Sequence, residues 1–108
     1  MHKMVVLAKA APGRVDDLAR WYDEEHLAQL LATPGFVSVE RHKVVPVKRP
    51  DATPEWDFLL IYELAGENPM QVLAAMSADR FRWSDALEST STVSVIALSE
   101  QRLVKNDD

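Results

Sequence analysis

Residues 14–36, RVDDLARWYDEEHLAQLLATPGF, decide the architecture of this 108-residue chain, because they hold one long helix and the turn that ends it. At about 100° per residue, seven side chains fall within one arc of about 120°. They are Val15, Leu18, Ala19, Tyr22, His26, Gln29 and Leu30, with Asp16, Asp17, Arg20 and Glu24 on the opposite side. This pattern predicts an amphipathic helix over 14–33. Pro34 and Gly35 end it, since proline cannot continue a helix and glycine accepts the left-handed cap.

Four further segments are predicted to form strands. Residues 3–10 are partly β-branched and end at an Ala-Pro-Gly turn, which is typical of a first strand. Residues 36–47 alternate between polar and apolar side chains and are rich in valine. Residues 55–64 are dense in aromatic and branched side chains and predict the most buried strand. Residues 92–103 predict the last strand, before a frayed tail.

Helices are expected between the later strands. Asn68 followed by Pro69 is typical of a helix start, so a second helix is predicted through about Met76. A further short helix is expected after Asp79, and it contains Phe81, Trp83 and Leu87. The order strand, helix, strand, strand, helix, strand predicts one α+β domain over residues 1–108. Its fold is ferredoxin-like βαββαβ, with an antiparallel sheet and both helices on one face.

The strand at 55–64 has apolar side chains on both faces. Alternation places Leu59 and Ile61 on one face, between Asp57 and Glu63, and a second apolar set on the other. This second set consists of Trp56, Phe58, Leu60, Tyr62 and Leu64. Because helices cover only one face, the other needs a partner, and a two-fold copy supplies one. We therefore expect a homodimer in which two sheets pack face to face and close a dimeric α+β barrel.

Composition argues against several classes of protein. Twelve Lys and Arg against 17 Asp and Glu give a net charge of −5, the wrong sign for binding nucleic-acid phosphates. The absence of cysteine removes disulfides, thiolate nucleophiles and zinc fingers. The apolar run before Lys9 has five residues, too few for a signal peptide or a membrane span. We expect a cytoplasmic protein that binds neither nucleic acid nor membrane.

Tyr22 and His26 are the main candidates for chemistry, because they lie four residues apart on the helix face turned toward the sheet. Burying a phenol or an imidazole without a partner costs about 1 to 3 kcal/mol. Three roles for His26 follow from this. In the first role, its imidazole forms a hydrogen bond with a backbone carbonyl or with Tyr62 and serves only packing. In the second, it is a general acid or base that lines a pocket, and in the third it is a metal or haem ligand.

The metal role has the least support. Asp23 and His26 have the i, i+3 spacing of a carboxylate–histidine pair, but one pair supplies too few ligands. His42 is the other candidate, on a predicted strand face shared with Phe36, Ser38 and Glu40, and alternation does not decide whether that face lines the pocket. We expect no metal. Asp23 or Glu25 would raise the proton affinity of His26 if it folded toward the imidazole.

Aromatic side chains are candidates for a substrate cavity, although core packing explains them equally well. They are Trp56, Phe58, Tyr62, Phe81 and Trp83. Trp21 lies off the core face and is assigned to packing, to a dimer contact or to a pocket rim. Ser84 and Asp85 have no histidine at the spacing of a hydrolase triad. The three glycines stand singly at turns, so there is no phosphate-binding loop.

The segments WYDEEHL at 21–27, TPGF at 33–36 and RHKV at 41–44 resemble EthD-like members of the dimeric α+β barrel superfamily. The strand FLLIYEL at 58–64 fits the same group, and the resemblance spans residues 3–103. Relatives include polyketide cyclases, muconolactone-type isomerases, cofactor-free monooxygenases, lyases and proteins without assigned activity. The resemblance implies a pocket between helices and sheet, with His26 as acid or base beside Tyr22 and Asp23. The larger haem-binding relatives of this group have additional structural elements that this chain lacks, so the resemblance argues against a haem ligand role for His26.

These observations predict a cofactor-independent acid–base enzyme for a small aromatic or enolisable carbonyl compound. Isomerisation, cyclisation, lyase cleavage and dehydration all remain open as its reaction. We expect His26 to move the proton, Tyr22 to donate a hydrogen bond to the developing oxyanion, and Asp23 to orient the imidazole. The alternatives are a noncatalytic protein that binds a small ligand or only dimerises, and a cofactor-free monooxygenase.

Overall fold

The computed structural model describes residues 2–78 and 84–105. The chain begins with strand β1 (His2–Ala8) and continues into a helix of three parts, which are α1 (Val15–Trp21), η1 (Tyr22–His26) and α2 (Leu27–Ala32). Strands β2 (Phe36–Lys43) and β3 (Phe58–Leu64) follow, and then helix α3 (Pro69–Ala78). A short 3₁₀ turn, η2 (Ser89–Ser91), leads into β4 (Val93–Ala97). This order confirms the predicted βαββαβ arrangement.

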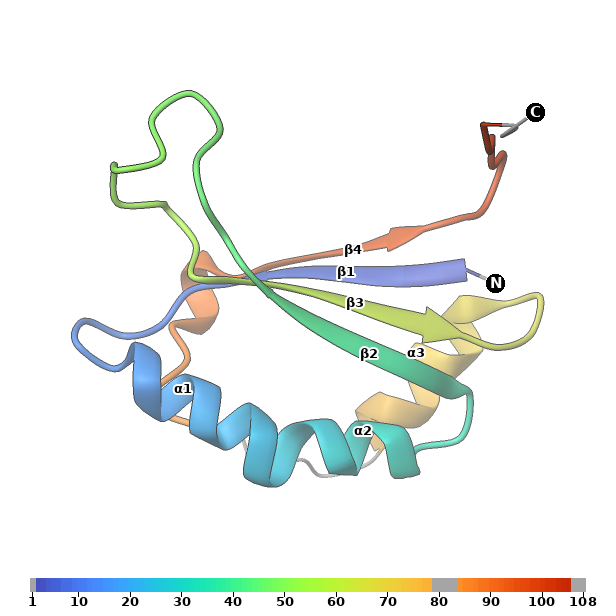
Figure 1. The fold of residues 1–108 in the computed structure, drawn as a ribbon. Coiled ribbons are helices and arrows are strands. Elements are labelled where there is room, and N and C mark those ends of the chain that lie inside the picture. Colours follow the sequence, from blue (N-terminus) through green and yellow to red (C-terminus); the bar gives the residue numbers. More distant parts are fainter. Residues whose placement is uncertain (1, 79–83, 106–108) are drawn as a thin grey trace.

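The four strands form one antiparallel sheet in the order β2-β3-β1-β4, and the helices cover one of its faces (Figure 1). Residues facing the helices alternate along the two central strands. On β1 these are Met4, Val6 and Ala8, and on β3 they are Phe58, Leu60, Tyr62 and Leu64, all buried. Leu18 and Leu30 from the long helix belong to the same buried core. The ferredoxin-like α+β fold is therefore confirmed.

The long helix contains one widened turn. The backbone N–H of Leu27 donates to the carbonyl of Tyr22, five residues back, which makes η1 a π turn. In a regular α-helix, residues four apart drift by about 40° around the axis, so a stripe at that spacing leaves the core after a few turns. The widened turn cancels part of this drift and keeps Leu18, Tyr22, His26 and Leu30 buried together.

Two residues assigned to the core face by periodicity are on the surface instead. Val15 and Gln29 are both exposed, whereas Trp21, placed off that face, is buried. A uniform step of about 100° cannot anticipate the exposure of Gln29, because the π turn changes the phase of the helix before that residue. Val15 and Trp21 precede that turn, and the buried side chains of α1 are Leu18 and Trp21.

Strand β2 carries a bulge between Phe36 and Ser38. The extra residue, Val37, shifts the alternation, so Phe36 lies on the helix-covered face together with Val39. The predicted grouping of Phe36 with Ser38, Glu40 and His42 on one face is therefore wrong. Ser38, Glu40 and His42 lie on the face turned away from the helices. They pair with Glu63, Ile61 and Leu59 of β3, in that order.

All four strands are shorter than the sequence predicted, and β3 begins at Phe58 instead of residue 55. Strand β2 ends at Lys43, opposite Phe58 at the start of β3, so Trp56 lies outside the ladder. Strand β4 ends at Ala97, opposite Lys3 of β1. Strand β1 ends at Ala8, before the predicted limit at residue 10. The expected helix after Asp79 falls largely outside the described residues, and Leu87 forms an isolated bridge with Ala10.

The connection from the long helix into β2 is tight. Gly35 has a φ of +96°, a conformation that glycine adopts without a steric penalty. A β-carbon at this position would lie 2.6 Å from Cγ2 of Val72 in α3. Helix α3 begins as predicted, with the Asn68 side chain accepting a hydrogen bond from the Met70 N–H at 3.1 Å.

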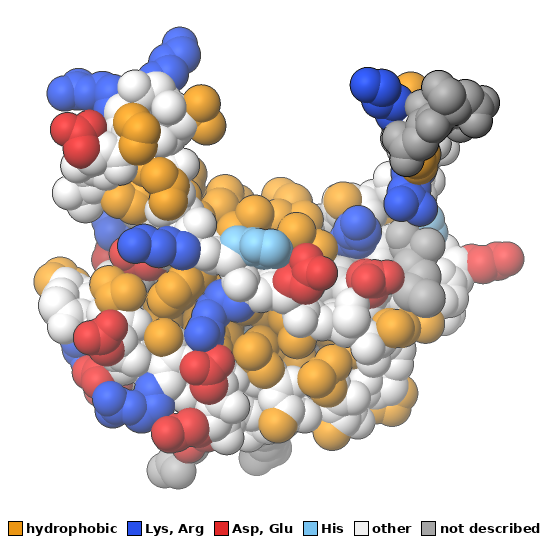
Figure 2. Space-filling model, viewed as in Figure 1, with side chains coloured by type: hydrophobic (Ala, Val, Ile, Leu, Met, Phe, Trp, Pro, Cys, Tyr) orange, Lys and Arg blue, Asp and Glu red, His pale blue; other side chains and the backbone are white. Residues whose placement is uncertain are grey.

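The other face of the sheet is apolar, and none of the helices in the described part of the chain covers it. Its central side chains come from three adjacent strands and comprise Val5, Leu7, Leu59, Ile61, Val93 and Val95. We call this set the open face. The β2–β3 connection at 44–57 and the segment after β4 both rise on this side, as two arms (Figure 1). Figure 2 shows hydrophobic surface between them.

Candidate functional site

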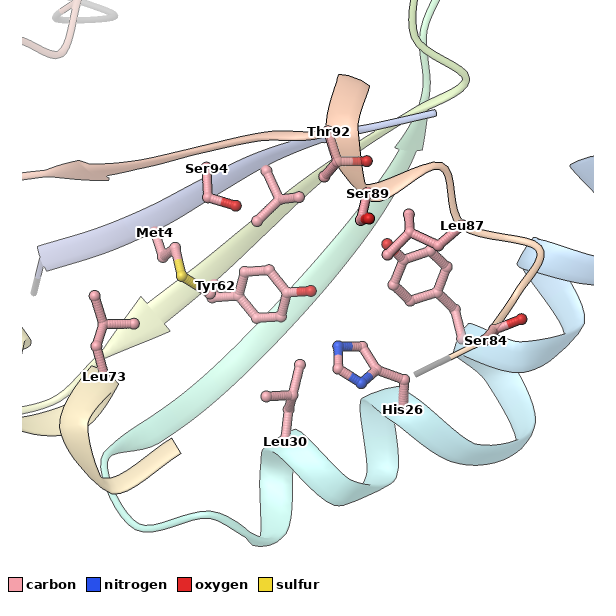
Figure 3. A pocket seen from close by; sticks show the side chains of 12 residues that line it. Met4, His26, Leu30, Tyr62, Leu73, Ser84, Leu87, Ser89, Thr92 and Ser94 are labelled. Atoms are coloured by element: carbon pink, nitrogen blue, oxygen red, sulfur yellow. The ribbon is translucent and has the colours of Figure 1, made fainter. Parts of the chain in front are cut away.

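A cavity of about 610 Å³ lies between the helix-covered face of the sheet and the helices. This volume is within the range of small-molecule sites. Figure 3 shows His26 and Leu30 on the helix side, Tyr62 on the sheet, and Ser94, Thr92 and Ser89 along the β4 side. The described lining residues are Met4, Val6, Tyr22, His26, Leu30, Tyr62, Leu73, Ser84, Leu87, Ser89, Thr92 and Ser94.

Tyr22 and His26 both line this cavity, as the spacing on the helix predicts. Tyr22 is 2% exposed and His26 is 4% exposed. Their ring centroids are 5.6 Å apart with planes inclined by 61°. The two residues begin and end the π turn, so this turn sets the angle between the phenol and the imidazole. An imidazole and a phenol therefore meet at one end of a hollow.

Burial controls the protonation of His26. Removal from water disfavours the charged imidazolium and lowers the pKa of His26 from 6.5 to about 4. The imidazole is therefore neutral near pH 7 and can accept a proton. On its other side the ring stacks on the indole of Trp21, with centroids 4.3 Å apart and planes inclined by 14°.

Two phenols supply hydrogen-bond donors. Burial raises the pKa of Tyr22 to about 12, although the positive charge of Arg41 acts in the opposite direction. Burial, reinforced by the neighbouring Tyr22, also raises the pKa of Tyr62. Figure 3 shows the Tyr62 hydroxyl pointing into the cavity on the side of His26. Both phenols stay protonated at neutral pH and can stabilise an anionic oxygen.

Asp23 does not orient His26. Its carboxylate is on the exposed side of the helix and pairs with Arg41, at 2.9 Å between Arg41 Nη1 and Asp23 Oδ1. Burial is the cause of the lowered pKa of His26. Arg41 also donates to the Ala19 carbonyl at 3.0 Å and lies over the Phe58 ring at 5.2 Å. The acidic run at 23–25 is thus a solvated face.

The other predicted substrate-binding residues are scattered. Phe58 packs edge-on against Tyr22, with centroids 6.3 Å apart, and supports that phenol from behind. Trp56 lies outside β3, and its indole N–H donates to the Ser91 carbonyl at 2.8 Å. His42 does not line the cavity, because the β2 bulge places it on the opposite face beside Glu40, at 3.2 Å. Phe81 and Trp83 lie outside the described residues.

The cavity wall includes hydroxyl groups that the sequence analysis did not assign to a cavity. Ser89, Thr92 and Ser94 come from η2 and β4, and Ser84 precedes them. Asp85, next to Ser84, is exposed and pairs with Arg14 at 2.7 Å, so no hydrolase triad forms there. The position of Ser94 between Val93 and Val95 was the available sequence signal, since alternation gives one face to both valines and the other to the serine.

No three histidine or carboxylate side chains converge within residues 2–78 and 84–105, so this part of the chain offers no ready metal site. Of the pair with metal-ligand spacing, His26 is buried, whereas the Asp23 carboxylate is exposed and pairs with Arg41. Within the same ranges, no helix combines the length and the apolarity needed to cross a membrane.

The sequence matches no known family profile and no curated protein. The structure, however, is similar to the crystal structure of an ethyl tert-butyl ether D (EthD) family protein from Bacillus halodurans. The TM-score is 0.61 at 14% sequence identity, and the match covers 93% of this chain and 99% of the other. The chain therefore has the fold of that protein over nearly its whole length, as the motifs on the first helix and third strand predicted.

Proposed function

We propose that this protein is a cofactor-independent acid–base enzyme that acts on a small aromatic or enolisable carbonyl compound. One arrangement carries the proposal, namely the neutral imidazole of His26 and the protonated phenols of Tyr22 and Tyr62 around one hollow. The rest of the described wall is formed by aliphatic side chains and by hydroxyls of serine and threonine, which suits an organic ligand with few polar groups.

The chemistry follows from these protonation states. His26 accepts a proton from the carbon next to the substrate carbonyl, and the electron pair of that C–H bond becomes a C=C bond. The carbonyl π electrons move to oxygen, which receives hydrogen bonds from Tyr22 and Tyr62. The imidazolium then returns the proton to the same or to another carbon, which makes isomerisation the simplest reaction. Loss of a β-substituent from the enolate would instead give elimination.

The test is proton exchange on a probe ketone. We expect the protein to accelerate the exchange of the C1 protons of 2-tetralone with D₂O, followed by NMR, without added metal or cofactor. His26→Ala should reduce this acceleration by at least about 100-fold, since general base catalysis contributes about 10²–10⁴. His42→Ala is the matched control and should retain the rate, because His42 lies on the other face of the sheet.

The outcomes separate the rival functions. Acceleration that survives in His26→Ala refutes the proposed mechanism. Binding of the ketone without any acceleration supports a noncatalytic ligand-binding protein, in which His26→Ala lowers the free energy of unfolding instead. Oxygen uptake with a naphthalenediol and no added flavin or metal supports the cofactor-free monooxygenase.

The proposal includes a homodimer formed through the open face. Val95 is 52% exposed there, and the arm beyond β4 carries Leu103 at 84% exposure. Two arms that rise beside an apolar sheet suit a second copy, because a two-fold axis places each arm against the partner's sheet and buries these side chains. The cavity is on the opposite face, so this contact leaves it unobstructed.

A further inference from the structure

The cavity has two ends of different character. At the inner end are His26, Tyr22 and Tyr62, none more than 4% exposed. At the outer end are Ser89 and Ser94, which are both exposed and thus mark the mouth of the cavity. The aliphatic part of the described wall is formed by Met4, Val6, Leu30, Leu73 and Leu87.

The inner end is unsuited to an anionic group. Among the described lining residues there is no lysine, arginine, aspartate or glutamate. The positive charge of Arg41 acts on the pKa of Tyr22. Its guanidinium, however, is already paired with the Asp23 carboxylate and donates to the Ala19 carbonyl. Burying a carboxylate without a cationic partner is strongly unfavourable. The described part of the wall therefore favours a ligand that is uncharged at the end that reaches His26.

The mouth, in contrast, offers hydroxyls for binding. Within the part of the chain that the structure describes, the side chains of Ser89 and Ser94 take part in no hydrogen bond. Thr92 between them differs, because its hydroxyl accepts from the Lys9 N–H at 3.3 Å and donates to the Glu88 carbonyl at 3.0 Å. Ser94 faces the cavity because it pairs with Val6 on the helix-covered side of the sheet.

We infer that the ligand carries two separated polar groups: an uncharged carbonyl or phenol at the inner end, and a hydroxyl or carbonyl that Ser89 and Ser94 bind at the mouth. These two serines are then specificity residues of the cavity. The inference rests on the function proposed for the same cavity, and it narrows the ligand to elongated, uncharged molecules with oxygen at both ends.

Three probes with one ring system test this by isothermal titration calorimetry near neutral pH. The probes are 2-naphthol, naphthalene-2,6-diol and naphthalene-2,6-dicarboxylate. We expect the diol to bind about fivefold more tightly than 2-naphthol, as one additional hydrogen bond allows. The dicarboxylate must bury one charge, and we expect it to bind at least about 100-fold more weakly than the diol.

Two variants test whether Ser89 and Ser94 cause the tighter binding of the diol. Ser89→Ala combined with Ser94→Ala should abolish the advantage of the diol and change the affinity for 2-naphthol less than about twofold. Ser38→Ala is the matched control, because its hydroxyl bonds to Glu63 on the other side of the sheet, and it should retain the advantage. Both variants should unfold at the denaturant concentration of the parent protein.

The failures are distinguishable. Dicarboxylate binding equal to that of the diol, or a diol advantage that persists without both serines, overturns the inference and leaves the proposed acid–base function intact. If neither neutral probe binds, the inference is overturned as well, and proton exchange on 2-tetralone then decides the proposed function separately. If the protein still accelerates proton exchange on 2-tetralone, only the ligand shape inferred here is wrong.

Discussion

The imidazole of His26 lies flat against the indole of Trp21, with ring centroids 4.3 Å apart. Trp21 immediately precedes the π turn that His26 ends, so the two rings stack along one helix. The indole blocks one face of the imidazole and limits rotation of its plane. Trp21 thus positions the proposed base without contacting the substrate.

Replacing Trp21 by leucine should lower the rate of 2-tetralone exchange about tenfold, because stacking of this kind contributes about 0.5–1.5 kcal/mol. Trp21→Phe keeps a ring at this position and should restore most of the rate. Steady-state kinetics on both variants measure the effect. A loss in Trp21→Phe as large as in Trp21→Leu would show that the indole acts in some way other than stacking.

Stability should depend on pH through His26. The folded pKa of about 4 is below the reference value of 6.5, so between these values the unfolded chain binds the proton more strongly. The free energy of unfolding therefore falls as the pH decreases from about 6.5 toward 4, by up to about 3 kcal/mol. Urea unfolding of the parent and of His26→Gln across this range isolates the contribution. Parallel curves for the two proteins would contradict it.

Asp23→Asn should leave proton exchange within about twofold of the parent rate. The carboxylate pairs with Arg41 on the outer side of the helix, and an exposed pair of this kind contributes at most about 1 kcal/mol to stability. The pH dependence of the exchange rate should also be unchanged. A displaced pH profile would restore the role that the sequence alone suggested for Asp23.

Gly35→Ala should destabilise the protein by about 3 kcal/mol, since it combines an unfavourable φ with a contact of 2.6 Å to Val72. Gly13→Ala is the matched control, because Gly13 also has a positive φ of 73° but has no atom within 4 Å of the added carbon. We expect only about 1 kcal/mol there. Urea unfolding compares the two, and equal losses would show that the Val72 side chain moves aside.

Val95→Asp should convert the proposed dimer into a monomer, because it places a charge in the middle of the open face. Size-exclusion chromatography with light scattering measures the mass. Ser94→Asp, one residue earlier and facing the other way, is the control that should remain dimeric. A parent protein that is monomeric at high concentration would refute the dimer itself.

Local patterns in the sequence predicted the fold and the centre of the site. The alternating burial predicted for residues 58–64 and the helix start predicted at Asn68-Pro69 are both confirmed, because each depends only on residues that are neighbours in the sequence. The errors arise where one residue changes the phase of an element. The π turn moves Gln29 to the surface, and the β2 bulge separates Phe36 from His42. Neither irregularity has a signature in residue type.

The missed part of the site has another cause. Ser84, Ser89 and Ser94 are small polar residues of which only Ser94 lies in an alternating pattern, and only the tertiary fold brings the three to one cavity. Asp23 was misassigned for a similar reason, since its partner Arg41 is 18 residues away on β2. Proximity along the helix suggested that Asp23 contacts His26, but Asp23 pairs with Arg41 instead.

Strand β4 serves two compartments at once. Its odd-numbered side chains, Val93 and Val95, point to the open face, while Ser94 points to the cavity. The proposed ligand preference and the proposed dimer contact therefore depend on alternate positions of the same five residues. A protein engineer could retune one of these properties through a single substitution and leave the other untouched, whereas inserting or deleting one residue in this strand would exchange them.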